Sequence, residues 1–69
     1  MKLIDYEGKK VRIVSNTNKK YEGYVGDYCY PEEDENNLEM IVVDVIKGDN
    51  EGKAVGLYEK DIKSIEIIE

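Results

Sequence analysis

The chain has 69 residues, with 10 lysines and arginines against 16 aspartates and glutamates, and therefore a formal net charge of −6. This length suffices for one domain, residues 1–69, and its core is thin because a domain of this size buries only about 60% of its unfolded surface. The negative charge disfavours nucleic-acid phosphates and anionic membranes as partners and favours basic ones.

The chain opens with a lead-in, residues 1–8, whose apolar side chains fit either a helical turn or a short extended segment. Residues 9–15 are predicted as the first strand, with Val11 and Ile13 on one face. A turn is expected at residues 16–18, because asparagine tolerates left-handed backbone and bonds to its own main chain.

Residues 20–30 are predicted as a long second strand, which Gly23 and Gly26 interrupt. Glycine inside a strand often marks a bulge or a sharp bend. Such bends allow one long strand to belong to both halves of a barrel. The next segment, residues 31–37, contains four consecutive carboxylates and is predicted as a loop.

Residues 38–47 are predicted as the third strand, and its apolar residues at both parities indicate partial burial of both faces. Residues 48–52 form a turn and residues 53–58 the fourth strand. Residues 59–61 are predicted as a brief connection, a single 3₁₀ turn.

Residues 62–68 are predicted as the closing strand, in which Ile65 and Ile67 alternate with Ser64 and Glu66. Several short strands at this spacing are typical of a barrel or sandwich. The pattern therefore predicts an all-β fold, a small five-stranded and strongly bent antiparallel barrel, and leaves open whether a short N-terminal helical turn or an extended segment precedes it.

Two blocks of residues resemble the motifs of Sm-like proteins, which belong to the wider group of SH3-like small barrels. Residues 20–25, with Asn37 and Leu38 further on, are similar to the first Sm motif, in which a glycine lies in an apolar strand and Asn precedes the next one. Residues 57–65 are similar to the second motif, an apolar strand, a short turn and an isoleucine-rich closing strand. The resemblance implies self-association, in which the fourth strand pairs with the closing strand of a neighbour.

Two differences from Sm proteins bear on function. The segment between Tyr28 and Asn37 is longer and more acidic than its Sm counterpart, and Glu59-Lys60 replaces the Arg-Gly pair of the second motif. Since that arginine helps to form the base pocket of RNA-binding members, its replacement argues against RNA binding and leaves the fold unaffected. The opening at residues 8–13 and the close at residues 63–68 are also similar to small bacterial and phage proteins, a likeness that implies no activity.

Tyrosines gather on or beside the second strand, and another lies on the fourth. Aromatic side chains on a small barrel can stack bases or line a groove for an extended peptide. The alternative is that tyrosine fills the core and rim in place of the absent Phe and Trp. The candidate binding residues are Tyr28, Tyr30, Tyr58, Glu32, Glu33, Asp34, Glu35 and Asn37.

The four carboxylates of residues 32–35 could hold Ca²⁺ or dock a basic partner. An EF-hand loop, however, needs oxygen ligands at alternating positions, a glycine at position six and a final glutamate. Because the segment lacks this spacing, we predict a solvated loop and no metal site.

A cluster of basic residues surrounds the first hairpin and could meet phosphates. We interpret these residues instead as edge-strand charges that discourage aggregation between sheets. They are Lys9, Lys10, Arg12, Lys19 and Lys20.

The chain has no histidine, and Cys29 is its only cysteine. A catalytic thiol needs a neighbouring base, so we expect Cys29 to be structural and at least half-buried. No Ser–His pair, phosphate-binding glycine loop or CxxC motif occurs. We therefore predict no enzyme activity and no cofactor. The unpaired thiol, with no signal peptide and no membrane-spanning run, indicates the cytoplasm.

We expect a non-enzymatic binding or assembly module that forms a homo-oligomer through its barrel edges, because a thin core leaves association as the most available supplement. Two alternatives stay open. One is an RNA-binding Sm-like protein, and the other is a module that uses the acidic loop and the tyrosines to hold a basic or proline-rich peptide.

Overall fold

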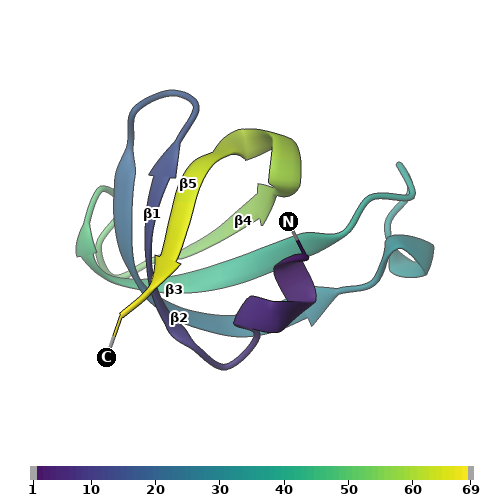
Figure 1. The fold of residues 1–69 in the computed structure, drawn as a ribbon, viewed down its shortest axis with the longest axis horizontal. Helices are drawn as coiled ribbons and strands as arrows, with labels where there is room; N and C mark the ends of the chain where they lie inside the picture. Colours follow the sequence, from purple (N-terminus) through teal and green to yellow (C-terminus); the bar gives the residue numbers. More distant parts are fainter. Residues whose placement is uncertain (1, 69) are drawn as a thin grey trace.

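The computed structural model describes residues 2–68 and forms one antiparallel sheet of five strands that rolls up on itself (Figure 1). Each predicted strand lies within one or two residues of an observed one, and the all-β fold is confirmed. The order across the sheet is β4-β3-β2-β1-β5. The strands are β1 (Lys10–Ser15), β2 (Lys20–Cys29), β3 (Met40–Gly48), β4 (Ala54–Tyr58) and β5 (Ile62–Ile67).

Short 3₁₀ turns connect or precede the strands. The lead-in forms η1 (Leu3–Tyr6), so the described part of this segment is a helical turn, while Met1 lies outside the described residues. The predicted loop after β2 contains η2 (Pro31–Glu33). The predicted single turn before the last strand is confirmed as η3 (Glu59–Asp61).

Strand β2 bends where its two glycines lie. The pairing of β2 with β3 shifts register between Glu22 and Gly23 and again around Gly26, so both predicted bulges are confirmed. A side chain at Gly23 would overlap the main-chain carbonyl of Asp44 on β3. The close approach of the two backbones therefore requires glycine at position 23, and the bends carry β2 around the core.

The core consists of aliphatic side chains and two tyrosines, and all five strands and η1 contribute to it. Val11 and Ile13 lie on the inward face of β1 as expected, and Leu3 of η1 is fully buried. Buried residues also alternate with less buried ones along β3. Met40 and Val42 on the other face of β3 are half-buried, which confirms partial burial on both faces. The buried apolar residues are Leu3, Val11, Ile13, Tyr21, Val25, Tyr28, Ile41, Val43, Val45, Leu57 and Ile62.

The rolled sheet is barrel-like but not closed. Within residues 2–68, β4 pairs only with β3 and β5 only with β1, so both strands have a free edge. The short η3 joins them, and Asn16 holds it in place: its main-chain N–H donates to the carbonyl of Asp61 at 2.9 Å and its side-chain amide donates to that of Lys60. Ile67 is 49% exposed because it lies near the end of an edge strand.

No helix in the described part of the chain is long and apolar enough to cross a membrane.

Candidate functional site

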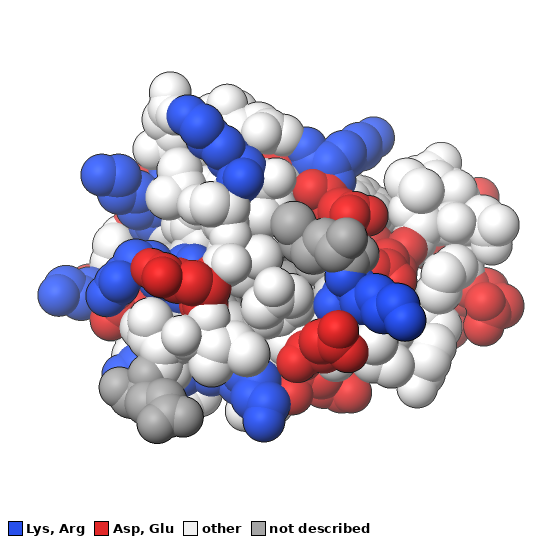
Figure 2. Space-filling model, in the orientation of Figure 1, with Lys and Arg blue, Asp and Glu red and all other residues white. Residues whose placement is uncertain are grey.

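The segment between β2 and β3, residues 31–39, is named here the acidic loop. It contains five carboxylates and no basic residue, so the remainder of the chain carries a net charge of only −1. In Figure 1 the loop projects from the end of the sheet opposite the β3–β4 hairpin. Red side chains gather toward that end in Figure 2, whereas several blue ones lie toward the other.

Two tyrosines stand where β2 leads into this loop. The ring of Tyr28 is buried, with 7% of the residue exposed, while Tyr30 is 50% exposed. Their ring centroids lie 5.1 Å apart at 88°, an edge-to-face contact that is favourable for aromatic pairs. Tyr28 is therefore part of the core, and Tyr30 offers an aromatic surface to solvent.

Glu39 fixes the far end of the acidic loop. Its Oε2 accepts a hydrogen bond from the Tyr28 hydroxyl at 2.7 Å, and its Oε1 accepts one from the main-chain N–H of Leu3 at 3.0 Å. One carboxylate thus joins the end of β2, the start of β3 and η1.

Asp34 fixes the middle of the loop. Its Oδ1 accepts a hydrogen bond from the Tyr58 hydroxyl at 2.8 Å. Its Oδ2 accepts from the main-chain N–H of Asn36 at 2.9 Å and of Leu38 at 3.4 Å. The loop is consequently attached to the end of β4, and most of its residues are exposed, in keeping with the solvated loop that the charge run predicts.

The remaining predicted loop residues have different positions. Glu33 Oε1 accepts from the main-chain N–H of Tyr30 at 3.0 Å and closes the η2 turn. Asn37 has a left-handed backbone, with φ of 58°. Glu32 and Glu35 are exposed. The structure therefore brings the predicted tyrosines and carboxylates together, and it leaves Glu32 and Glu35 directed to solvent as potential contacts.

The phenol–carboxylate hydrogen bonds shift the pKa of Tyr28, Tyr58 and Asp34. The hydrogen bond to Glu39, with burial, raises the pKa of Tyr28 to about 12. The hydrogen bond to Asp34, with burial, also raises the pKa of Tyr58. In turn, the Tyr58 hydroxyl and two main-chain N–H groups lower the pKa of Asp34, although partial burial opposes the shift. These phenols consequently act as donors at neutral pH.

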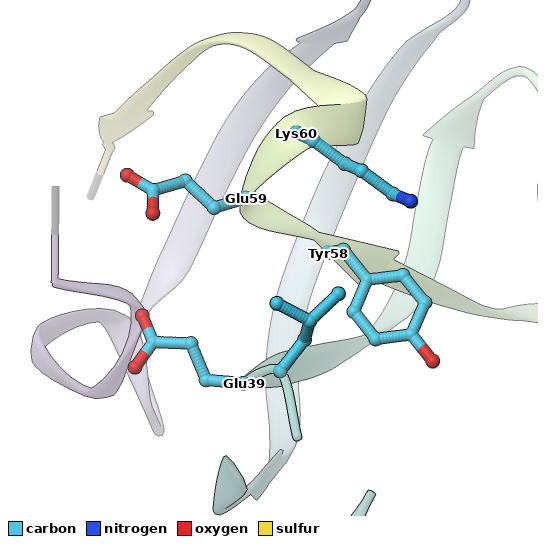
Figure 3. Close-up of a pocket in the computed structure, with 5 residues that line it drawn as sticks. Glu39, Tyr58, Glu59 and Lys60 are labelled. Carbon is cyan, nitrogen blue, oxygen red and sulfur yellow. The ribbon is translucent and has the colours of Figure 1, made fainter. Parts of the chain in front are cut away.

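A pocket of about 280 Å³ adjoins the loop and is lined by Leu38, Glu39, Tyr58, Glu59 and Lys60. In Figure 3 the carboxylates of Glu39 and Glu59 point to one side of the pocket, and the side chains of Tyr58 and Lys60 to the other. The ammonium of Lys60 lies 5.8 Å from the centre of the Tyr58 ring. The pocket thus combines apolar and aromatic walls with carboxylates at one side.

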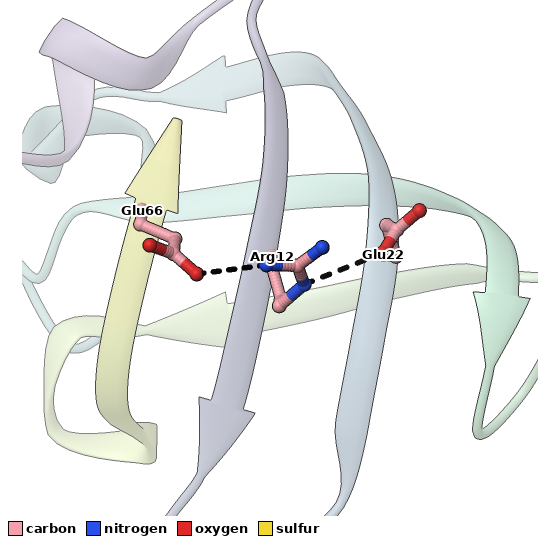
Figure 4. Close-up of polar contacts among 3 residues, drawn as sticks. All are labelled: Arg12, Glu22 and Glu66. Carbon is pink, nitrogen blue, oxygen red and sulfur yellow. Dashed lines mark hydrogen bonds and ion pairs between the residues drawn. The ribbon is translucent and has the colours of Figure 1, made fainter. Parts of the chain in front are cut away.

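Arg12 lies in a charge ladder on the outer face of the sheet. Its guanidinium donates to Glu66 on β5 at 3.1 Å and to Glu22 on β2 at 3.4 Å (Figure 4), and these bonds raise its pKa further. Strand β1 lies between β2 and β5 and is not an edge. Strand β2, which begins at Lys20, is internal as well, so the interpretation of Lys10, Arg12 and Lys20 as edge-strand charges is wrong. Arg12 instead links three neighbouring strands.

A second pocket, of about 310 Å³, lies on the outer face near the β1–β2 and β3–β4 hairpins. Its lining contains one carboxylate, Glu22, which is paired with Arg12. Within residues 2–68, neither Lys20 nor Lys47 forms an ion pair. The pocket, named here the basic hollow, is lined by Arg12, Val14, Lys20, Tyr21, Glu22, Lys47 and Gly48.

Cys29 is half-buried, as expected. Burial and the nearby carboxylates of Asp27, Glu33 and Asp34 raise the pKa of its thiol, so the nucleophilic thiolate is scarce at neutral pH. Among residues 2–68 no group of three cysteine or carboxylate side chains is arranged to hold a metal ion.

Sequence reasoning missed Glu39, Leu38 and Lys60. Glu39 lies directly before β3, two positions from the Ile41 that faces Tyr28 across the β2–β3 ladder. Its contact with Tyr28 depends on the path by which the acidic loop returns to the sheet. The residue pattern does not predict this path.

No protein-family model matches this chain, and no curated protein or solved structure matches it either.

Proposed function

We propose that this chain is a non-enzymatic assembly module of the Sm-like or SH3-like small-barrel type, which associates with copies of itself through its two free sheet edges. The observation that carries this proposal is that β4 and β5 each pair with only one other strand within residues 2–68. A free edge presents unpaired N–H and C=O groups that readily pair with another strand.

The direction of the main-chain groups defines each edge. Ile68 N donates to Lys10 O at 2.8 Å. In an antiparallel ladder, hydrogen-bonded residue pairs alternate with non-hydrogen-bonded ones. Because Ile68 is hydrogen-bonded to β1, the main-chain N–H and C=O groups of Ile67 and Ile65 point away from β1. On the β4 edge, Val45 N donates to Lys53 O at 2.9 Å. The same alternation therefore directs the main-chain N–H and C=O groups of residues 54 and 56 away from β3.

These directions favour pairing of β4 with the β5 of another copy. The free groups of β5 belong to Ile65 and Ile67, opposite the core residues Ile13 and Val11. The free groups of β4 belong to outer-face residues, which alternate with buried Leu57. Facing residues of a strand pair lie on one side of the sheet. Joining β4 to β5 therefore places the two cores on opposite sides of the shared sheet.

Pairing of β4 with β4, or of β5 with β5, does not place the two cores on opposite sides of the shared sheet. Two β5 strands, or two β4 strands, would place both cores on the same side, and each sheet curls toward its core. The two rolled sheets would then compete for the same space. Unlike edges give a head-to-tail interface, which generates a ring if the rotation closes and a filament if it does not.

The chemistry of the described residues supports a non-enzymatic role. The chain has no histidine, the thiol of Cys29 has a raised pKa, and the hydroxyls of Tyr28 and Tyr58 are engaged as donors. The single cysteine is also in keeping with the reducing cytoplasm, where we place the protein.

The test compares two lysine substitutions at similarly exposed isoleucines. Ile67→Lys alters the β5 edge, and Ile46→Lys alters the outer face of β3; these residues are 49% and 47% exposed. Light scattering across a concentration series should show oligomers for the wild type and for Ile46→Lys and weaker association for Ile67→Lys. A wild type that remains strictly monomeric at about 1 mM would exclude the proposal, because even weak self-association is populated there.

A second function, binding of a basic peptide, is favoured by the pocket beside the acidic loop. The pocket offers Leu38 and Tyr58 as apolar contacts, and Glu32 and Glu35 are exposed nearby in the sequence. An extended peptide with cationic and apolar or proline side chains complements this combination.

Chemical-shift mapping with Arg/Pro-rich peptides tests this second function. Shifts should concentrate between Tyr28 and Leu38 and should disappear in Glu32→Gln/Glu33→Gln/Glu35→Gln. The matched control Asp5→Asn/Glu7→Gln/Glu51→Gln removes the same charge from other exposed positions and should bind normally. Equal losses in both variants would indicate a net-charge effect and not a site.

RNA binding receives the least support. The tyrosines that would stack bases lie among carboxylates, and Tyr28 is buried. Electrostatic binding is strongest at low salt, so a titration with single-stranded RNA at low salt tests this alternative. The absence of detectable binding there would exclude it.

A further inference from the structure

The acidic loop and the basic hollow are complementary in charge. The loop carries five carboxylates, whereas the hollow contains Lys20 and Lys47, neither of which has an ion-pair partner within residues 2–68. In a chain of net charge −6, this hollow is a local exception. An acidic group approaching it would gain charge complementarity without displacing an existing ion pair of either lysine.

The two surfaces also match in their apolar parts. Tyr30, at the start of the loop, is 50% exposed. The hollow has the half-buried Val14 as its apolar lining residue, whereas Tyr21 borders it with only 5% of the residue exposed and belongs to the core. An aromatic side chain on an apolar floor, surrounded by charges of opposite sign, is a frequent arrangement at protein interfaces.

The positions of the surfaces prevent them from meeting within one copy. Figure 1 shows the loop at one end of the molecule and the β3–β4 hairpin, which adjoins the hollow, at the other. The longest dimension of the chain is 30 Å. A contact between loop and hollow must therefore join two molecules.

The loop is already ordered for such a contact. Asp34 is held by Tyr58, and Glu33 closes the η2 turn on Tyr30. Because the loop conformation is fixed by internal hydrogen bonds, docking costs less conformational entropy than it would for a free segment.

We propose that the acidic loop of one copy docks in the basic hollow of a second copy, with Tyr30 against Val14 and the carboxylates of Glu32 and Glu35 near Lys20 and Lys47. This charge-driven contact is distinct from the edge pairing proposed above. Since its two halves lie at opposite ends of the molecule, it continues head to tail along the long axis.

A charge exchange between two variants tests this contact. Lys20→Glu/Lys47→Glu makes the hollow acidic, and Glu32→Lys/Glu35→Lys places lysines at the two contact positions of the loop while Glu33 and Asp34 keep their hydrogen bonds. Each variant alone should associate more weakly than the wild type at low salt, because like charges then face each other. An equimolar mixture should associate at least about fivefold more tightly than either variant alone, since the reversed surfaces match again.

Matched controls separate this contact from general charge effects and from edge pairing. Lys2→Glu/Lys9→Glu and Asp5→Lys/Glu7→Lys make the same charge changes at exposed positions outside both surfaces and outside β4 and β5, and their mixture should show no comparable gain. The gain should persist when both partners also carry Ile67→Lys, which weakens only the edge contact.

The outcomes distinguish the two proposals. A mixture of the loop and hollow variants that associates no more tightly than its components, or no more tightly than the control mixture, overturns the loop–hollow contact. Edge pairing would still stand if Ile67→Lys weakened association of the wild type. Conversely, recovery in the mixture without any effect of Ile67→Lys would leave only the loop–hollow contact.

Discussion

The hydroxyl of Tyr58 donates to Asp34 Oδ1 at 2.8 Å, and this bond attaches the middle of the acidic loop to the end of β4. The two residues are 24 positions apart in the sequence. A segment rich in like charges would be expected to move freely, yet here one carboxylate serves as the acceptor for a phenol and for two main-chain N–H groups. This bond explains how an acidic loop acquires a defined shape.

Removal of the Tyr58 hydroxyl should therefore loosen the loop. In Tyr58→Phe the amide protons of Asn36 and Leu38 should exchange faster with solvent, because Asp34 loses the donor that positions it. Hydrogen exchange followed by NMR measures this. Tyr24→Phe is the control, since the structure assigns the hydroxyl of this half-exposed tyrosine no hydrogen bond within the described chain. Unchanged exchange in Tyr58→Phe would show that the loop is held by its main chain alone.

Tyr28 should make stability depend on pH in the alkaline range. Its pKa rises from an ordinary value of 10.0 to about 12 in the folded chain. The folded state therefore favours the neutral phenol, and the resulting stability is fully present below pH 10.0 and is lost as the pH approaches 12. Urea unfolding between these pH values should show a steeper decline for the wild type than for Tyr28→Phe.

Spectroscopy provides an independent check of the same shift. In a titration followed by tyrosinate absorbance, the late-titrating component of the wild type should be smaller in Tyr28→Phe, in which only the raised pKa of Tyr58 still contributes to it. Identical late components in the two proteins would contradict the assignment to Tyr28.

The bends of β2 predict unequal effects of alanine at its two glycines. A Cβ at Gly23 would overlap the main-chain carbonyl of Asp44, whereas a Cβ at Gly26 would meet the Asp44 side chain, which can rotate away. Gly23→Ala should lower the free energy of unfolding by roughly 3 kcal/mol or more, and Gly26→Ala by less than about 1 kcal/mol. Chemical denaturation of both variants measures the difference, and similar losses would mean that the backbones can separate at Gly23.

Cys29 should react slowly in the folded chain. Burial and nearby carboxylates raise its pKa and deplete the thiolate, which is the reactive form. Alkylation at neutral pH should be slower than that of free cysteine and should accelerate in urea. A folded-state rate equal to that of free cysteine would show that the thiol is neither shielded nor shifted.

Much of the fold could be predicted because local patterns determine it. The strand alternation around Val11 and Ile13, the bends at Gly23 and Gly26, and the single turn of η3 all follow from residue types in short windows. The position of β1 could not be predicted in this way. That strand is internal because β5 returns to pair with it, and pairing between distant segments leaves no local signal.

The candidate site was predictable in composition and not in geometry. Tyrosines and carboxylates marked the loop, and the structure places them together. The sequence could not separate Asp34, which holds the loop, from Glu32 and Glu35, which face solvent. That distinction depends on the distance from each carboxylate to the Tyr58 hydroxyl on β4. Sequence alone cannot tell which of several adjacent acidic residues lies within hydrogen-bond distance of it.

The pairing of β5 with β1 also has a consequence for how the chain folds. The hairpins β1–β2, β2–β3 and β3–β4 join neighbouring segments, but Ile13 and Ile65 meet from nearly opposite ends of the chain. Closing so long a loop costs more entropy and slows folding. We therefore expect the four-strand meander to form first and β5 to dock last, so that the slowest step of folding creates both the complete core and the second free edge.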